Sequence, residues 1–238
     1  MSCVVVKIGT ESVIGNIAKI AKDIHNAKEI GVNVVLVSSG AVGTGRKYIK
    51  FDEENKIRKQ ILAGVGQARL MLEYIDEFKK HDLILVQILL SKKNFIGKMK
   101  ENLKNLLKEI AKNPNIIAII NENDTVIPSD MLFIDNDELS SYVAKLINAK
   151  KLIILTNVDG VYDDFHAKNR QIIKTITLKS KLHISQDKSA TGRGGMFNKV
   201  KIGMKMLKCK IQTTIVNIQE KDVIVKCIKN EDIGTRFV

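Results

Sequence analysis

The sequence predicts an α/β protein in which helices cover both faces of a mostly parallel β-sheet. The strand candidates are apolar along most of their length, as in Asn33 to Val37 and Ile116 to Ile120, which is typical of strands buried on both faces. Amphipathic segments with apolar residues at helical spacing separate them. The 238 residues contain no Pro-, Gly- or Ser-rich linker, so one large domain is favoured.

The first half of the chain alternates between strands and helices. Cys3 to Ile8 is a β-branched strand that ends at Gly9-Thr10. The helix after it is predicted at residues 14–29, where Ile17, Ile20 and Ile24 have helical spacing. The next elements are a strand at 33–37, a small-residue loop at 38–43, a helix at 55–80, a strand at 84–89, a helix at 98–111 and a strand at 116–120.

The second half repeats this alternation. It is predicted to contain a helix at 137–147, a strand at 151–156, a helix at 198–206, a strand at 213–218, a helix at 221–228 and a last strand at 234–238. We expect the last strand to lie at an edge of the sheet.

Polar or small residues follow four of the predicted strands. They are Lys7 to Thr10, Ser38 to Gly43, Asn121 to Asp124, and Thr156-Asn157. In a parallel sheet, ligands bind at the carboxyl ends of the strands, where loops lead into helix N-termini that favour anions. The sequence therefore predicts a ligand site at this edge.

Two clusters of carboxylates and amides stand out, Asn121 to Asp124 and Asp135 to Asp137. Such side chains can bind an amino group, a hydroxyl group or a hydrated Mg2+. Acidic residues at the start of a helix are often caps, which explains part of the second cluster. Capping does not explain why Asn121 and Asp124 accompany it.

Three segments could contact a phosphate, although each alone also has an ordinary structural explanation. Lys7-Ile8-Gly9 places a cation beside a glycine that backbone or phosphate can approach. Ser38-Ser39-Gly40-Ala41 could equally cap a helix. The glycines at 192–195 precede a helix with Lys199 in its first turn, an arrangement that can hold an anion. Neither a Walker A sequence nor a dinucleotide fingerprint occurs.

The formal net charge of +13 raises the question of a nucleic-acid partner. The lysines are scattered over every predicted helix, aromatic residues make up 5% and tryptophan is absent. A solvated lysine-rich surface is therefore favoured over a nucleic-acid site. No apolar run is long enough for a membrane helix, and the N-terminus does not resemble an export signal, so we expect a cytoplasmic protein with no membrane partner.

The cysteines and histidines form no recognisable site. Cys3, Cys209 and Cys227 are widely spaced in apolar or amphipathic surroundings, which indicates reduced core thiols. The four histidines lack metal-ligand spacing and a nucleophile partner, so we expect no protein-bound metal site. They are His25, His81, His166 and His183.

Taken in order, several segments resemble the amino acid kinase family, and within it the members that phosphorylate L-glutamate. The match spans nearly the whole chain. The segments are Val5 to Thr10, Val37 to Val42, Ala63 to Arg69, Ile120 to Asp124, Asp135 to Asp137, Leu155 to Tyr162 and Gly194 to Met196.

This resemblance implies a three-layer α/β/α sandwich around a mainly parallel sheet of about eight strands. It implies one kinase domain over residues 1–238, whose N-terminal part binds the substrate and whose residues from about 151 to 238 bind the nucleotide. Because Gly234 to Val238 matches the end of that domain, we expect the PUA domain of many relatives to be absent. A homodimer or homotetramer and feedback by proline are also implied.

The implied reaction transfers the γ-phosphoryl group of ATP, with Mg2+, to the side-chain carboxylate of L-glutamate, towards proline. The implied catalytic residues are Lys7, Asp137 and Lys199, with Asp137 orienting the two lysines. The implied substrate-binding residues are Ser39, Gly40, Ala41, Asn121, Asp124 and Asn136. The implied nucleotide-binding residues are Lys7, Gly9, Thr156, Asn157, Arg193, Gly194, Gly195, Met196 and Lys199. Mg2+ is expected to arrive on the ATP phosphates.

Two residues depart from the family pattern. Asn157 stands where an aspartate is usual, and Glu11 where a small residue is common. Three alternatives therefore stay open: a family member with another anionic acceptor such as acetylglutamate, UMP or carbamate, a catalytically silent ligand-binding protein on this fold, and a nucleic-acid-binding protein. The retention of Lys7, Asp137 and Lys199 together argues against a silent protein.

Overall fold

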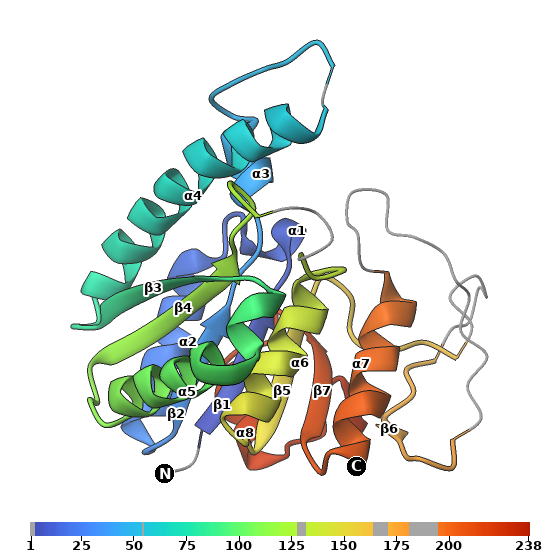
Figure 1. The fold of residues 1–238 in the computed structure, drawn as a ribbon. Helices are drawn as coiled ribbons and strands as arrows, with labels where there is room; N and C mark the ends of the chain where they lie inside the picture. Colours follow the sequence, from blue (N-terminus) through green and yellow to red (C-terminus); the bar gives the residue numbers. More distant parts are fainter. Residues whose placement is uncertain (1–2, 54, 128–131, 164–170, 181–194) are drawn as a thin grey trace.

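The computed structural model describes residues 3–53, 55–127, 132–163, 171–180 and 195–238. Within this part of the chain, eight strands form one sheet in the order β3-β4-β2-β1-β5-β7-β8-β6 (Figure 1). The strands are β1 (Cys3–Ile8), β2 (Asn33–Val37), β3 (Ile84–Leu90), β4 (Ile116–Glu122), β5 (Lys151–Thr156), β6 (Thr175–Ile176), β7 (Gln212–Asn217) and β8 (Thr235–Phe237). The predicted mainly parallel sheet is confirmed.

Helices cover both faces of the sheet and complete three layers. They are α1 (Thr10–Val13), α2 (Ile17–Glu29), α3 (Ala41–Gly45), α4 (Lys56–Lys79), the 3-10 helix η1 (Lys92–Phe95), α5 (Gly97–Ala111), α6 (Asn136–Leu146), α7 (Met196–Lys208) and α8 (Val223–Lys229). One hydrophobic core joins α2, α4 and α8 to one face of the sheet, and a second core joins α5, α6 and α7 to the other.

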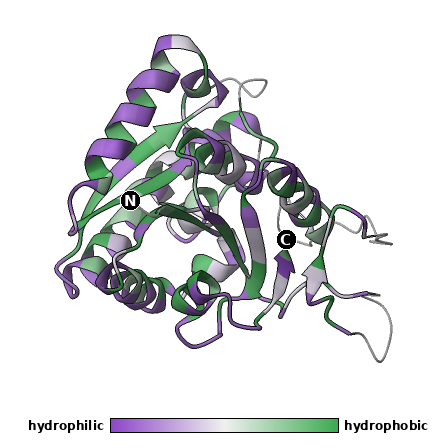
Figure 2. Cartoon of the chain, turned by 90° about the horizontal axis from the view of Figure 1, so that it is seen from below, coloured by the Kyte–Doolittle hydropathy of each residue, from purple (hydrophilic) through white to green (hydrophobic). Residues whose placement is uncertain are grey.

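Alternation along the strands explains the two cores. In β1, Val4, Val6 and Ile8 belong to the first core, whereas Val5 belongs to the second. Successive side chains of a strand point to opposite faces, so a strand between two helical layers must be apolar on both. Figure 2 shows the resulting hydrophobic strands between helices that are hydrophilic on their outer sides.

Strand β1 lies near the middle of the sheet and sets the position of the candidate site. It pairs in parallel with β2 and with β5, so that Lys7 lies opposite Val37 on one side and Ile154 on the other. Strand β4 pairs in parallel with β2. The carboxyl ends of these four strands therefore meet at one edge, as the sequence predicts.

The last strand is not at the edge of the sheet, so this expectation is wrong. Strand β8 runs antiparallel to β7, and its other side pairs with the two-residue strand β6, which takes the edge position. A two-residue strand carries no periodicity that a sequence pattern could detect. The structure also extends β4 beyond Ile120 to Glu122, so Asn121 belongs to the strand itself.

Helices α3 and α4 are in close contact because glycines allow it. A Cβ atom on Gly66 of α4 would overlap the carbonyl oxygen of Ala41, and one on Gly45 of α3 would overlap that of Leu62. Only glycine permits two backbones to approach this closely. This contact holds Gly40 and Ala41 against α4 at the carboxyl edge of the sheet.

The cysteine expectation is only partly correct. Cys227 is buried and Cys3 is partly buried, but Cys209 is exposed at the C-cap of α7. Burial raises the pKa of Cys227 to about 12 and that of Cys3 to about 11. None of the helices of the described part of the chain is long and apolar enough to cross a membrane.

A buried carboxylate between α2 and α8 gives a testable dependence of stability on pH. Asp23 is 3% exposed, accepts a hydrogen bond from the Val223 backbone N–H and lies 3.7 Å from the Lys19 ammonium. Burial raises the pKa of Asp23 from 3.8 to about 6, and nearby Asp222 adds to this rise, against the opposing effect of Lys19. The folded state therefore holds this proton more tightly than the unfolded state does.

Because the pKa of Asp23 is raised in the folded state, protonated Asp23 contributes stability below about pH 4. This contribution is lost as the pH rises through about 6. Replacing Asp23 with asparagine should therefore raise the unfolding free energy at pH 7 by on the order of 2 kcal/mol, but not at pH 4. Urea unfolding at both pH values measures this. Glu29→Gln, on the exposed end of α2, is the matched control. An equal effect of Asp23→Asn at both pH values would contradict the explanation.

Candidate active site

Three charged side chains from distant parts of the sequence meet at the carboxyl end of β1. The Lys7 ammonium, on β1, lies 2.6 Å from Oδ1 of Asp137, and the Lys199 ammonium, on α7, lies 2.9 Å from Oδ2. The three side chains are 6%, 1% and 12% exposed. One carboxylate thus fixes two lysines, and the trio keeps a formal charge of +1, which favours an anionic ligand.

The electrostatics of the trio follow from burial and mutual contact. Burial alone would raise the pKa of Asp137, but Lys7 and Lys199 outweigh it and hold that pKa below its usual value. Burial lowers the pKa of Lys7, and Lys199 lowers it further, against the opposing effect of Asp137. Asp137 lies in the first turn of α6, where the helix dipole also favours a negative charge.

An amide network lies beside the trio. Nδ2 of Asn136, the residue before Asp137, donates hydrogen bonds to Oγ of Ser39 at 2.8 Å, to the Ser38 carbonyl at 2.7 Å and to Oδ1 of Asn121 at 2.9 Å. Nδ2 of Asn121 in turn donates to Oε1 of Gln67 at 2.6 Å. These bonds join α6, β4, α4 and the loop after β2 in one rigid polar surface.

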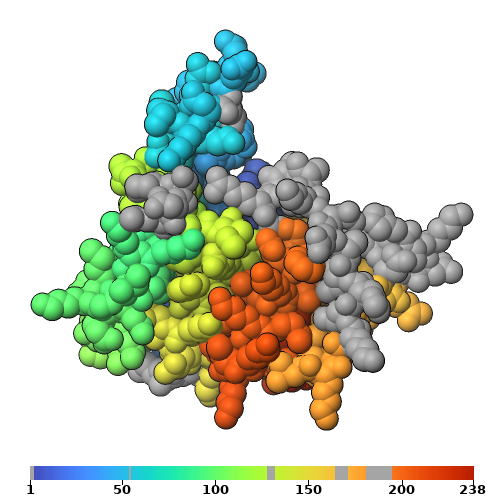
Figure 3. Space-filling view, turned by 45° about the vertical axis from the view of Figure 1, so that its right-hand side comes forward, coloured from blue at the N-terminus to red at the C-terminus, as the bar shows by residue number. Residues whose placement is uncertain are grey.

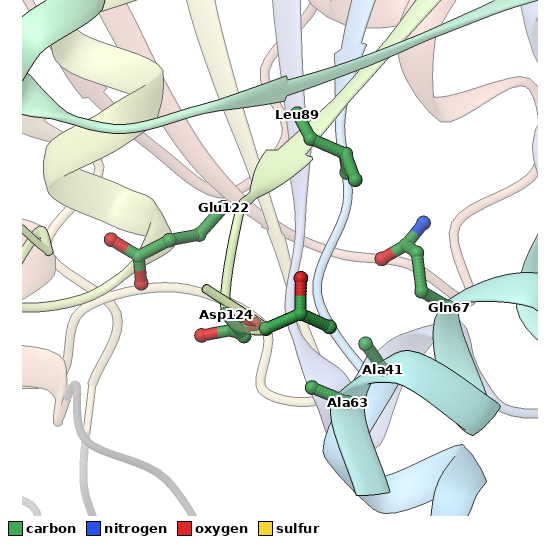
Figure 4. A pocket seen from close by; sticks show the side chains of 7 residues that line it. Ala41, Ala63, Gln67, Leu89, Glu122 and Asp124 are labelled. Atoms are coloured by element: carbon green, nitrogen blue, oxygen red, sulfur yellow. The ribbon is translucent and has the colours of Figure 1, made fainter. Parts of the chain in front are cut away.

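A small pocket opens next to this network. Its lining is Ala41, Ala63, Gln67, Leu89, Glu122, Asp124 and Thr125 (Figure 4). Asp124 follows β4, and the backbone of Ala41 follows Gly40, whose φ of 109° is a conformation that favours glycine. The structure therefore brings together all six residues that the resemblance assigns to the substrate.

Thr156 and Asn157, which are expected to contact the nucleotide, lie at the carboxyl end of β5, and β5 pairs with β1 on the side opposite β2. Asn157 accepts a hydrogen bond from Oγ of Ser12 at 2.7 Å, just beyond Thr156 at the end of β5. Gly195 is the N-cap residue of α7 and Met196 is its first residue, so Lys199 lies in the first turn of this helix. Arg193 and Gly194 lie outside the described residues. The Glu11 side chain is exposed in the first turn of α1.

Two buried polar residues of this region, Gln67 and Glu122, were not among the predicted site residues. Gln67 is 9% exposed and lies on the buried face of α4, so its signal was a polar residue at an apolar helical position. Glu122 is 6% exposed, and its Oε1 accepts a hydrogen bond from the Phe133 backbone N–H. Its signal was a carboxylate close behind the apolar run from Ile116 to Ile120.

The donor set around Asp137 does not fit a metal ion held by protein ligands alone. Both oxygens of Asp137 already contact lysine ammonium groups. Within the described ranges, no three His, Cys, Asp or Glu side chains are grouped so that they could hold a metal. A divalent cation would therefore need most of its ligands from a phosphate ligand and from water.

The fold and this site define a class of α/β proteins with a cationic cluster at the carboxyl edge of a mostly parallel sheet. A model of the amino acid kinase family matches residues 2–217. The chain belongs to the amino acid kinase family, whose members are ATP-using kinases.

Curated relatives agree with this assignment. The chain is 37% identical over 254 residues to glutamate 5-kinase of Oenococcus oeni, covering 98% of this chain and 94% of that protein. It is 36% identical over 220 residues to glutamate 5-kinase of Bacteroides thetaiotaomicron, covering 87% of this chain but only 60% of the relative.

Among solved structures, carbamate kinase from Giardia lamblia bound to AMP-PNP matches with a TM-score of 0.71 at 16% identity, over 100% of this chain and 98% of that one. An isopentenyl phosphate kinase matches with a TM-score of 0.67 at 15% identity, over 99% of this chain and 100% of that one. These likenesses confirm the predicted fold.

Proposed function

We propose that the protein transfers the γ-phosphoryl group of ATP to the side-chain carboxylate of L-glutamate. The observation that carries this proposal is the Lys7–Asp137–Lys199 trio, which lies directly beside the amide network of Asn136 and Asn121. A cationic group next to a polar pocket is what transfer between two anions requires. Relatives named glutamate 5-kinase at 36–37% identity support the choice of acceptor.

In this mechanism a carboxylate oxygen of glutamate attacks the γ-phosphorus, the bond from that phosphorus to the bridging oxygen breaks, and ADP leaves. Lys7 and Lys199 offset the negative charge of the transferred group, and Asp137 keeps both ammonium groups in position. Glutamate is already ionised at neutral pH, so the step needs no general base. The negative charge on the ATP phosphates would be offset further by a Mg2+ ion that they carry, with few ligands from this chain.

The proposed function divides the chain into an acceptor-binding part and a nucleotide-binding part. The N-terminal part, with Ser39, Gly40 and Ala41 near Asn121 and Asn136, binds the acceptor. Residues from about 151 to 238 bind ATP through Thr156, Asn157 and residues 193–196, with Gly9 and the two lysines at the phosphates. The whole described site belongs to one kinase domain.

Asp124 is proposed to bind the ammonium group of glutamate, which gives a sharp test of the acceptor. Incubation with MgATP, L-glutamate and hydroxylamine should yield γ-glutamyl hydroxamate, because hydroxylamine traps the acyl phosphate. The ratio of kcat/KM for L-glutamate to that for glutarate, which lacks the amino group, should fall about 10- to 100-fold in Asp124→Asn, as expected for loss of a charged hydrogen bond.

Thr125→Val is the matched control, since Thr125 lines the same pocket without a charge. It should leave the glutamate-to-glutarate ratio unchanged. ADP release with acetylglutamate, UMP or carbamate, but no hydroxamate from glutamate, would assign another acceptor. Nucleotide binding without ADP release on any acceptor would instead indicate a silent ligand-binding protein.

A further inference from the structure

A buried hydroxyl group lies beside the loop that carries Ser39 and Gly40. The N-terminal end of α4 stands out from the rest of the surface (Figure 3), whereas Tyr74, in the C-terminal half of the helix, is 0% exposed and belongs to the first core. Its hydroxyl oxygen lies 3.0 Å from Oγ of Ser38. A phenylalanine would fill the same space against the ring of Phe78, so packing does not explain the hydroxyl group.

The hydrogen bonds of this hydroxyl group have a fixed direction. Oγ of Ser38 donates its single hydrogen to the Ser39 carbonyl at 3.1 Å. The Tyr74 hydroxyl therefore donates to Oγ of Ser38, which leaves neither hydrogen unpaired in the core. Burial raises the pKa of Tyr74, so this donor keeps its hydrogen at neutral pH. The bonds thus run from α4 through Ser38 to the loop.

Ser38 holds the start of this loop with all of its polar atoms. Its N–H donates to the Ile120 carbonyl at 2.8 Å, its carbonyl accepts from Nδ2 of Asn136 at 2.7 Å, and its Oγ makes the two bonds just described. The next two N–H groups, those of Ser39 and Gly40, donate to no backbone carbonyl of the described residues. Their position therefore depends on the bonds that hold Ser38 and on the Asn136 network.

We propose that Tyr74 is a positioning residue for phosphoryl transfer: through Ser38, its hydroxyl group fixes the backbone of Ser39 and Gly40 against the acceptor carboxylate. This inference rests on the proposed function. Tyr74 itself touches no substrate. A displacement of about 1 Å at a reacting centre can cost on the order of 100-fold in rate, so a looser loop should slow the transfer step more than it weakens acceptor binding.

The same face of α4 supports the site at a second point. Gln67 lies seven residues before Tyr74, about two helical turns, and therefore on the same side of the helix. Its Oε1 accepts a hydrogen bond from Nδ2 of Asn121 at 2.6 Å. Two polar groups on a buried helical face thus hold β4 and the loop after β2 from one rigid element.

The variant Tyr74→Phe removes the hydroxyl group and keeps the ring. We expect kcat for γ-glutamyl hydroxamate formation to fall about tenfold, and KM for glutamate to change by less than about threefold. Tyr142→Phe, which removes the hydroxyl group of a half-buried tyrosine on α6, is the matched control and should leave both parameters unchanged. Adding Tyr74→Phe to Ser38→Ala should lower kcat no further, because the two side chains act as one unit. A further tenfold loss in the double variant would overturn the route through Ser38.

Hydrogen exchange measures the loop without relying on catalysis. In Tyr74→Phe the Ser38 amide, which is bonded to Ile120, should exchange about tenfold faster, whereas the Val5 amide in the middle of the sheet should be unchanged. Equal acceleration of both amides would indicate a general loss of stability and would overturn the proposal, as would an unchanged kcat in the folded variant. A parent protein that forms no hydroxamate would contradict the proposed function, and the exchange rates would still decide whether Tyr74 fixes the loop.

Discussion

Replacing Asp137 with asparagine is expected to lower kcat by about 100- to 1,000-fold, the usual effect of removing one element of electrostatic preorganisation. The amide cannot hold two ammonium groups, so Lys7 and Lys199 would separate from the positions that one carboxylate now fixes at 2.6 and 2.9 Å. KM for ATP should change less than kcat. Steady-state kinetics with both substrates varied measures the two parameters separately.

Stability must be measured alongside, because Asp137 is buried between two cations. Breaking a buried ion pair by removing one partner typically costs about 3 to 5 kcal/mol. Urea unfolding therefore gives the conditions under which the variant is folded and the kinetics are valid. Asp135→Asn is the matched control, since Asp135 caps α6 through Glu138 N–H at 2.8 Å and asparagine caps equally well.

The alkaline limb of the pH profile adds a signature that a folding defect would not give. The pKa of Lys7 is already below its usual value because of burial. Loss of the Asp137 charge should lower that pKa further, so kcat should begin to fall at a lower pH in Asp137→Asn than in the parent. An unchanged kcat with an unchanged alkaline limb would contradict the assigned role.

Replacing Gly66 with alanine is expected to lower the unfolding free energy by at least about 3 kcal/mol. The added methyl group would overlap the carbonyl oxygen of Ala41. This oxygen belongs to the backbone, so it cannot move aside as a side chain could. Helices α3 and α4 would have to separate. Because Gln67 and Ala41 line one pocket from these two helices, KM for the acceptor should rise as well. Urea unfolding and steady-state kinetics measure the two effects.

Gly64→Ala is the matched control for this variant. Gly64 lies in the same helix. A Cβ atom added there would lie 3.3 Å from a methyl group at the end of the Thr125 side chain. Its stability should change by less than about 1 kcal/mol, the range of the helix preference of alanine over glycine. Equal losses in the two variants would show that the α3–α4 contact is not the cause.

The regular elements could be predicted because each carries its own periodic pattern. Long helices such as α4 and buried strands such as β2 begin and end within two residues of the predicted limits. Helix α1 and strand β6 were missed because four and two residues are too few to show a period. The edge position of β6, and hence the interior position of β8, followed from pairing that no local pattern encodes.

The sequence predicted where the candidate site lies, but not which of its residues contact one another. The ends of the predicted strands indicated where polar groups gather. The family resemblance supplied the role of each residue. Lys7 is buried because Asp137, far along the chain, offsets its charge. Such a contact depends on the sheet order. In this sheet β1 lies between β2, which follows it in sequence, and β5, which is distant in sequence.

The central position of β1 has a consequence for folding. The strand precedes the other described strands in the chain, but one of its two neighbours, β5, begins only at Lys151, and Lys199 follows later still. Contacts between such distant segments slow folding, because a long loop must close before they form. A nascent chain that ends before Lys151 leaves one edge of this apolar strand unpaired. It should therefore tend to aggregate rather than fold as a half-domain.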